Sequence, residues 1–196
     1  MKTMTVDQLK DTLEKAMKFN DYDWNRKMRI KYKTKKRAEG LEYYIYFCPK
    51  CQKIQTISTH GNDVYCSHCG TIATFDMYGF IEGLPFDNLV EWGKLQKEVL
   101  PSIAHNVYLS EGMMYEINFK KNKRIPLGFM RIKLENNVLT FEKNQNKFVF
   151  NIDDVQGLAI SQKRFLSFDY IKQTYLVAFK DPMLFLDVIH TLKGDQ

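Results

Sequence analysis

The chain has 196 residues and a mass of 23.2 kDa, and 44% of its residues are hydrophobic and 14% aromatic, so it can hold one or two small domains with a buried core. This composition excludes a disordered chain, and no apolar run reaches the roughly 18 residues that cross a bilayer. The charged segment from Met1 to Lys10 lacks the apolar core of a signal peptide, so we expect a soluble, cytoplasmic protein.

The net charge of +6 is concentrated near the N-terminus. Residues 1–40 carry 12 Lys and Arg against 6 Asp and Glu, whereas residues 41–196 carry 17 of each sign. One run without any acid supplies most of the excess, and its cations are Arg26, Lys27, Arg29, Lys31, Lys33, Lys35, Lys36 and Arg37. Such a run favours binding to phosphate groups or to an anionic surface, and a solvated basic linker is the alternative interpretation.

Residues 1–42 are expected to form a helix followed by this basic segment. Thr5 and Gln8 have the spacing of a capping box, and the apolar residues after them recur at helical spacing, which predicts an amphipathic helix over residues 6–19. Its apolar face needs a partner. Further on, Met28, Ile30 and Tyr32 alternate with cations, and this period predicts a strand with one cationic face.

The four cysteines form two C-x-x-C pairs separated by fourteen residues, and they are Cys48, Cys51, Cys66 and Cys69. Each C-x-x-C turn presents two thiolates from one loop, so two turns supply the four ligands of a tetrahedral Zn²⁺. Residues 54–59 are expected to form a strand and residues 61–63 a turn, which gives a zinc-ribbon hairpin over residues 43–84. We predict a structural zinc, because four thiolates leave no open position for water or substrate.

Other interpretations of the cysteines remain. Iron held by four thiolates would serve electron transfer, and disulfides or metal-free thiols are also consistent with the spacing. Disulfides are disfavoured because the N-terminus lacks a signal core. His60 and His68 lie beside the thiolates, but exchanging either for a cysteine would leave an unused thiol, so we interpret both as surface residues.

Two strands and a helix should surround the cysteine pairs. Aromatic residues 43–47 predict a strand leading into the first pair, and residues 71–75 predict one after the second pair. Residues 86–88 then cap a connecting helix within residues 85–109, which Pro101 should stop or kink.

The C-terminal part of the chain changes to short strands. We expect them at residues 114–119, 127–134, 138–142, 147–151, 157–162, 165–169 and 174–179. Asn136-Asn137 suits a two-residue hairpin, Asn144-Gln145-Asn146 a longer turn, and Asp181-Pro182 the start of a final helix. This order is typical of pleckstrin-homology (PH) and GRAM-like barrels. The predicted fold class is therefore α+β, with the zinc-ribbon module followed by a PH/GRAM-like antiparallel β-barrel and a C-terminal helix over residues 110–196.

Several local sequences together resemble a known family. They are Ala38-Glu39-Gly40-Leu41-Glu42, Tyr46-Phe47-Cys48-Pro49-Lys50-Cys51, Cys66-Ser67-His68-Cys69-Gly70, Tyr78-Gly79-Phe80 and Phe86-Asp87-Asn88-Leu89 with Trp92. In this order they resemble the C-terminal extension of certain bacterial 1-acylglycerol-3-phosphate acyltransferases, over most of residues 5–100 and more weakly through the barrel. The resemblance implies an accessory region of a phospholipid-synthesis enzyme.

The catalytic motif of that family is H-x-x-x-x-D, in which the carboxylate orients the histidine that deprotonates the acceptor hydroxyl. One match exists, from His190 to Asp195, at the end of the final expected helix. It leaves no room for the other motifs of the family, so we interpret it as chance and expect this chain alone to be non-catalytic.

Three functions are consistent with the sequence. The first is an accessory module that binds an anionic phospholipid surface at the inner face of the membrane, or the acyltransferase catalytic domain, as a peripheral protein. The second is nucleic-acid binding, with bases stacked on Tyr32, Tyr43, Tyr44 and Tyr46, which the balanced charge of the barrel disfavours. The third is a protein-interaction scaffold.

Overall fold

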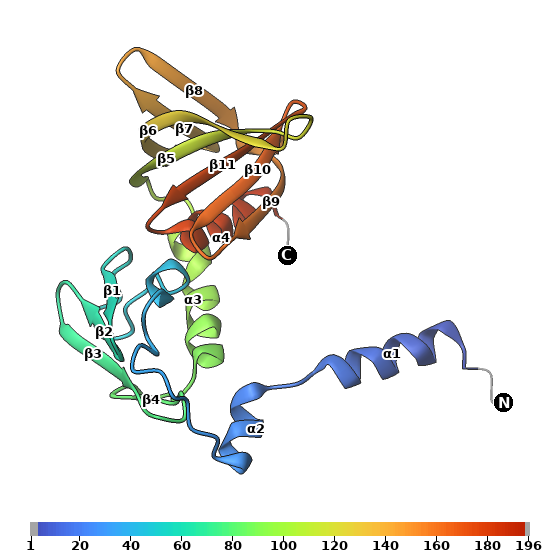
Figure 1. Ribbon diagram of the computed structural model, residues 1–196, viewed down its shortest axis with the longest axis vertical. Helices are drawn as coiled ribbons and strands as arrows, with labels where there is room; N and C mark the ends of the chain where they lie inside the picture. The colour runs from blue at the N-terminus through green and yellow to red at the C-terminus, as the bar shows by residue number, and fades with distance from the viewer. Residues whose placement is uncertain (1–3, 195–196) are drawn as a thin grey trace.

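Two antiparallel sheets and four α-helices make up residues 4–194, the part of the chain that the computed structural model describes (Figure 1). The fold is α+β. The smaller sheet and the larger sheet form two lobes joined by helix α3 (Leu89–Ile103), and helix α1 (Val6–Met17) extends away from both lobes. Within residues 4–194, no helix is long and apolar enough to cross a membrane.

The smaller sheet carries the second cysteine pair. Its strands lie in the order β1 (Ile57–His60), β2 (Asp63–Cys66), β3 (Gly70–Phe75) and β4 (Ile81–Glu82), each antiparallel to its neighbour. Val64, Ile72 and Trp92 are buried beneath it, and the Trp92 indole Nε1 donates a hydrogen bond of 3.0 Å to the Phe47 carbonyl oxygen. We call residues 38–82 the cysteine lobe.

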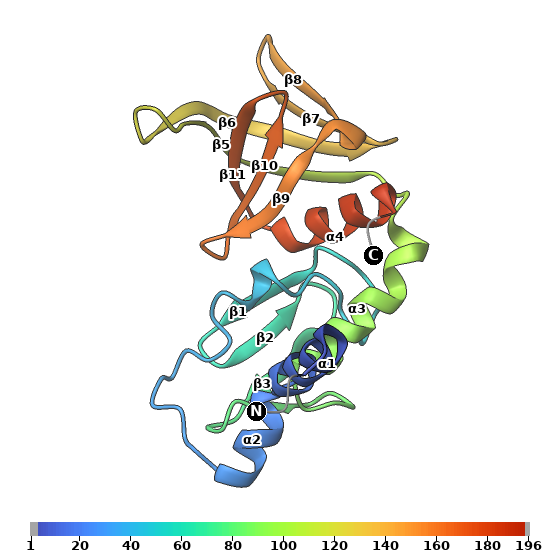
Figure 2. The ribbon, with the colours of Figure 1, turned by 90° about the vertical axis from the view of Figure 1, so that its right-hand side faces the viewer.

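The larger sheet is a curled antiparallel half-barrel. Its spatial order is β8-β7-β6-β5-β11-β10-β9, from strands β5 (Tyr108–Asn118), β6 (Lys123–Glu135), β7 (Val138–Lys143), β8 (Asn146–Asn151), β9 (Gln156–Ser161), β10 (Phe165–Tyr170) and β11 (Gln173–Phe179). Helix α4 (Pro182–Lys193) packs beside the sheet, as Figure 2 shows. Phe185, Val188 and Ile189 of α4 are fully buried, so the helix completes the core of the half-barrel.

Two-residue turns fix the register of this sheet. Asn136 and Asn137 join β6 to β7 with φ values of 50° and 60°, the left-handed conformation of a tight hairpin turn, as the sequence predicts. Lys143 pairs with Asn146, so the next turn is also two residues long, shorter than expected. Ile171 and Lys172, with φ values of 48° and 70°, join β10 to β11.

The capping box at the start of α1 is confirmed. The Gln8 backbone N–H donates to the Thr5 hydroxyl, and the Thr5 backbone N–H donates to the Gln8 side chain. None of the residues of α1 is buried, so its apolar face has no partner among residues 4–194. Pro101 does not stop α3, which continues to Ile103.

The predicted strand over residues 28–32 is wrong. Helix α2 (Asp21–Met28) ends at Arg29, which has a left-handed φ of 53°. The buried Asn25 side chain then bonds both backbone groups of Ile30, at 2.7 and 3.1 Å, and donates to the Tyr78 carbonyl oxygen at 2.7 Å. This side chain satisfies the backbone groups that a neighbouring strand would otherwise pair.

The predicted strand over residues 43–47 is also wrong. A 3₁₀ turn, η1 (Leu41–Tyr43), replaces its start. The Gln96 side-chain oxygen accepts from the backbone N–H groups of Tyr46 and Phe47, at 2.8 and 3.3 Å, so this segment pairs with a helix side chain. Phe47 keeps one isolated bridge, to Ile54.

Candidate metal centre

The first cysteine pair lies on a tight loop that its own backbone closes. The Cys48 N–H donates to the Lys53 carbonyl oxygen at 2.9 Å, and the Gln52 N–H donates to the Cys48 carbonyl oxygen at 2.8 Å. Gln52 has a φ of 59°, which turns the chain back at this point. Both thiols of the pair therefore extend from one rigid loop.

The second pair lies at the turn between β2 and β3. Cys66 ends β2, and Gly70, with a φ of 73°, begins β3. The His68 backbone N–H donates to the Cys66 sulfur at 3.5 Å, and the Thr56 hydroxyl lies 3.4 Å from the same sulfur. These contacts orient Cys66 toward the first loop.

The two pairs meet in space. The sulfur atoms of Cys48, Cys51, Cys66 and Cys69 all lie within 4.8 Å of one another, and those of Cys51 and Cys66 are 3.6 Å apart. A tetrahedral ion with metal–sulfur bonds of about 2.3 Å separates its ligands by about 3.8 Å, so the spacing suits such an ion. A disulfide requires about 2.05 Å between sulfurs, and all four cysteines are free.

The thiols differ strongly in acidity. Burial would raise the pKa of Cys66, but hydrogen bonds from Thr56 and from the backbone N–H groups of His68 and Cys69 outweigh it and lower the pKa to about 6. A hydrogen bond to Cys51 raises the pKa of Cys69 to about 12, and burial raises that of Cys48. Four thiolates this close repel one another, so full ionisation requires a cation between them.

The histidines beside the site stay outside the cluster. His68 is exposed, and its Nδ1 lies 3.4 Å from the Lys53 ammonium. His60 is exposed at the end of β1. Among residues 4–194, the only group of possible ligands that comes together in this way consists of the four cysteines.

The chain on either side of the first loop contacts the half-barrel. The Tyr46 hydroxyl donates to the Asp187 carboxylate at 2.9 Å, and the Gln55 amide donates to the Asp181 carboxylate at 3.2 Å. Burial raises the pKa of both carboxyls and of Tyr46. The segment that carries Cys48 and Cys51 is therefore anchored to the half-barrel on both sides.

The basic segment divides into two groups of cations. Arg26 makes a two-bond ion pair with Asp87 at 2.6 and 3.1 Å, Lys36 pairs with Glu39 at 3.1 Å, Arg29 lies 3.8 Å from the centre of the Tyr78 ring, and Arg37 donates to the Tyr32 carbonyl oxygen at 3.3 Å. The exposed lysines Lys27, Lys31, Lys33 and Lys35 have no ion pair within the described part of the chain. The second group therefore carries the charges of the segment that no acid within the described part of the chain neutralises.

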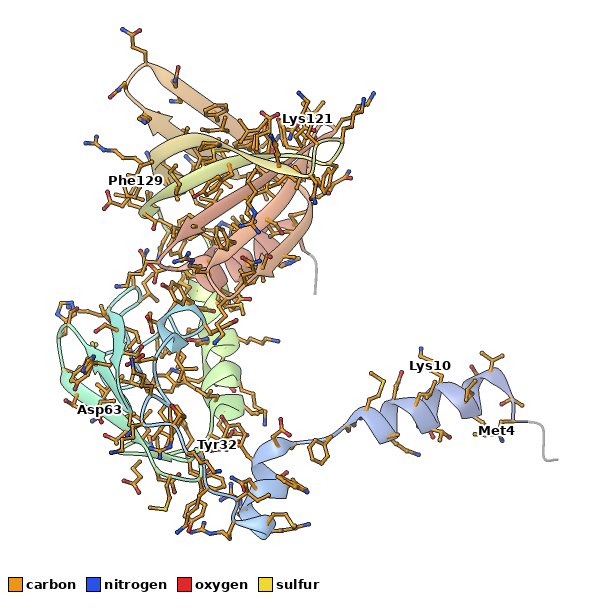
Figure 3. All side chains as sticks on the ribbon, in the orientation of Figure 1. Met4, Lys10, Tyr32, Asp63, Lys121 and Phe129 are labelled. Atoms are coloured by element: carbon orange, nitrogen blue, oxygen red, sulfur yellow. The ribbon has the colours of Figure 1, made fainter. Side chains whose placement is uncertain are left out.

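A second cationic surface lies at one end of the half-barrel, where sequence reasoning missed it. The β5–β6 and β10–β11 turns are neighbours there, because Ile117 pairs with Thr174 and the Gln173 amide donates to the Ile117 carbonyl oxygen at 3.0 Å. Figure 3 shows Lys121 at the end of the β5–β6 hairpin. We call this end the barrel tip, which we define by six exposed residues, Phe119, Lys120, Lys121, Lys123, Ile171 and Lys172; Asn122, Arg124 and the acidic Asp169 are exposed beside them.

Comparison with known proteins gives little further information. No protein-family model and no curated protein sequence matches the chain. A solved structure of inner membrane complex sub-compartment protein 3 from Toxoplasma gondii is similar at 19% identity and a TM-score of 0.30, over 42% of this chain and 77% of that one. The proposals below rest on the residues of this chain.

The fold and the site define a class: an α+β protein with a four-cysteine cluster in its smaller lobe and a seven-stranded half-barrel in its larger one. The candidate acyltransferase motif contributes nothing to this site. His190 lies in the last turn of α4, and Asp195 lies outside the described residues.

Proposed function

We propose that the chain is a non-catalytic accessory module, folded around a structural zinc, that binds an anionic phospholipid surface. In this proposal the cysteine lobe is a zinc ribbon, the half-barrel is a PH/GRAM-like module, and the enzyme served is a phospholipid-synthesis acyltransferase, which the resemblance of residues 5–100 supports. The observation that carries the membrane part is the barrel tip.

The chemistry of the cysteine cluster supports zinc. Four thiolates in tetrahedral arrangement suit zinc or iron, and both ions fit the sulfur spacing. All four positions are filled by protein ligands, so the metal stabilises the fold and offers no open position for catalysis. The contacts of Tyr46 and Gln55 with α4 give such a structural metal a role in holding the two lobes together.

The barrel tip combines exposed apolar side chains with lysines. Phe119 and Ile171 are 73% and 75% exposed, and Lys120, Lys121, Lys123 and Lys172 have no ion pair among residues 4–194. Apolar side chains of this kind enter the headgroup region of a bilayer, and each lysine near an anionic surface contributes about 1 kcal/mol. The tip has the composition of a membrane contact.

The backbone at Ile171 supports a role at the surface. Ile171 is the only β-branched residue with a left-handed φ among residues 4–194. This conformation costs a β-branched residue about 1–2 kcal/mol, and Asn adopts it more readily. Because Ile171 is exposed, its side chain gains little core packing to offset that cost. A partner that buries the side chain accounts for its presence.

Vesicle co-sedimentation tests the membrane contact. We expect the chain to bind vesicles rich in phosphatidylglycerol, to ignore phosphatidylcholine vesicles, and to lose binding as salt rises. Changing Lys120, Lys121, Lys123 and Lys172 to Gln should abolish binding. The matched control changes Lys27, Lys31, Lys33 and Lys35 to Gln. It removes the same charge and should retain most of the binding to the vesicles. The separate change Ile171→Asn should weaken binding while leaving the fold as stable or more stable.

Three results would contradict this proposal. Loss of binding only in the control variant would move the contact to the basic segment. Tight binding of oligonucleotides together with indifference to vesicles would favour a nucleic-acid module. Elemental analysis of protein purified without added metal should find one zinc per chain, and iron, or less than about half an equivalent of zinc, would refute the metal assignment.

A further inference from the structure

Helix α1 presents an apolar face that nothing in the described chain covers. Val6, Leu9, Leu13 and Met17 recur along one side of the helix and are 82%, 50%, 52% and 79% exposed. A helix of twelve residues is marginal in water on its own and owes its stability to packing of its apolar face. This face therefore requires a partner.

An apolar groove of matching character lies between the two lobes. A cavity of about 470 Å³ opens between η1, α3 and α4. Leu41, Ile45, Leu89, Trp92 and Met183 form its walls, and Lys97 and Asp187 also line it. Gly93 of α3 lies in the groove, and a Cβ atom at this position would meet no atom within 4 Å. The groove is open where a second helix would pack.

The dimensions of α1 fit this groove. Twelve residues make a helix about 18 Å long, while the groove follows α3 from Leu89 to Lys97, about 12 Å, and continues to Met183 of α4. Lys10 and Glu14 border the apolar face on one side, because they lie at helical positions next to Val6 and Met17. Lys10 and Glu14 lie 4.0 Å apart on α1, and Asp187 accepts from Tyr46, so exchange of partners with Asp187 and Lys97 would replace contacts that exist within the chain.

We propose that the groove binds α1 of a second copy of this chain, and that two copies exchange their helices reciprocally. Figure 1 shows α1 extending from the same side of the molecule on which α3 lies, and Figure 2 looks onto that side. Helix α1 and helix α3, whose residues line the groove, therefore lie toward the same side of the molecule. Two-fold exchange closes the assembly, with the same contact made twice.

The connection between α1 and α2 favours exchange over folding back. It consists of Lys18, Phe19 and Asn20, and its backbone is held at both ends. The Phe19 N–H donates to the Met17 carbonyl oxygen at 2.8 Å, and the Asn20 side chain accepts from the Tyr22 N–H at 3.0 Å as the cap of α2. Such a short connection directs α1 away from its own groove.

Charge argues against a membrane as the cover for α1. Its residues include Asp7, Asp11 and Glu14 against Lys10 and Lys15, whereas helices that lie on anionic membranes are rich in Lys and Arg. Half of the accessible surface of a helix this size, plus an equal area of groove, is about 700 Å². Two exchanged helices then bury about 1,400 Å², which lies within the range of stable interfaces.

Light scattering after size exclusion tests the exchange with the full chain. We expect twice the chain mass of 23.2 kDa for the unchanged protein. Leu9→Asp with Leu13→Asp should give monomers, and so should Gly93→Arg, which fills the groove from an open helix position. The control Lys15→Gln with Lys18→Gln lowers the net charge by the same two units as the leucine changes and should stay dimeric. Circular dichroism and zinc content verify that each variant is folded.

Mixing the two monomeric variants distinguishes exchange from other dimers. The Leu9→Asp, Leu13→Asp chain keeps an intact groove, and the Gly93→Arg chain keeps an intact α1, so the mixture regains one of the two contacts. This single contact of about 700 Å² should give heterodimers that are weaker than the dimer of the unchanged protein. Pairing of α1 with α1 would leave the Gly93→Arg chain dimeric and would overturn the proposal. A monomeric unchanged protein at about 100 μM, roughly a hundredfold above a typical micromolar Kd, would overturn it as well.

Discussion

The hydrogen bond from Tyr46 to Asp187 should contribute measurably to stability. It joins the segment before the first cysteine loop to α4, with an oxygen–oxygen distance of 2.9 Å. Changing Tyr46→Phe leaves the partly buried carboxylate without this donor. Hydrogen bonds to charged groups contribute about 1.5–3 kcal/mol, so we expect a loss of about 2 kcal/mol, or roughly 4–8 °C in Tm for a chain of this size.

The protonation state of Asp187 sets the pH dependence of that loss. Burial raises the pKa of Asp187 above its ordinary value of 3.8. The folded state thus holds this proton more tightly than the unfolded state, and the ionised carboxylate lowers stability as pH rises through the raised pKa. Tyr46 partly offsets this penalty. The cost of Tyr46→Phe should therefore be largest at neutral pH and shrink in acid.

A double-mutant cycle with Asp187→Asn isolates the interaction. Urea unfolding at neutral pH, with zinc kept saturating, gives the free energy of unfolding for the two single variants and the double variant. The side-chain amide that Asp187→Asn introduces accepts a neutral hydrogen bond, so Tyr46→Phe should cost about 1 kcal/mol in that background. An equal cost in both backgrounds, or a cost below about 0.5 kcal/mol at neutral pH, would refute the reasoning.

Three further predictions concern packing, ligands and chemistry. Gly112→Ala should destabilise the half-barrel by about 3 kcal/mol or more in thermal unfolding, because the new Cβ would collide with the Ala178 carbonyl oxygen and lie 2.7 Å from the Phe179 Cβ. The control Gly93→Ala, at an open helix position, should stabilise the fold by up to about 1 kcal/mol. Cys66→Ser should lower zinc content to well below one equivalent, and His68→Ala should leave it unchanged. The purified chain should show no acyl transfer from an acyl thioester to lysophosphatidate, and activity that His190→Ala removes would contradict this.

Local signals explain why the strands of the half-barrel were predictable. The second half of β6 and the start of β7 alternate in burial, and the turn between them carries Asn136 and Asn137, which accept a left-handed backbone. The starts of β5 and β6 were missed: β5 begins at Tyr108 and β6 at Lys123, earlier than expected. The start of each strand pairs with the end of the other, Tyr108 with Leu134 and Lys123 with Asn118. Alternation within one strand does not reveal such pairing.

The two wrong strands had a non-local cause. The backbone groups of Ile30 bond the Asn25 side chain, and the Tyr32 N–H bonds the Met77 carbonyl oxygen. The N–H groups of Tyr46 and Phe47 bond the Gln96 side chain of α3. A polar side chain that arrives from another element leaves no trace in the segment it caps. Met28, Ile30 and Tyr32 do alternate with cations, but this alternation does not lead to a strand.

The cysteine spacing predicted the cluster, whereas the proposed role of the basic segment stays a prediction, and charge counting over long stretches missed the barrel tip. Residues 41–196 are neutral as a whole, and this balance concealed the local run Lys120-Lys121-Asn122-Lys123-Arg124. The run alone would have indicated a cationic turn. That Ile171 and Lys172 lie beside it depends on the pairing of β5 with β11, which joins strands far apart in the chain.

The arrangement around the first cysteine loop suggests why a structural metal is placed there. Tyr46 precedes the loop and Gln55 follows it, and each bonds a different carboxylate, Asp187 or Asp181, at opposite ends of the first half of α4. A metal that ties Cys48 and Cys51 to the β2–β3 turn fixes the distance between these two anchors. The half-barrel is then held by two points, which restrains rotation as well as separation of the lobes. A metal bound by the four cysteines would therefore orient the half-barrel, and with it the barrel tip, relative to the cysteine lobe.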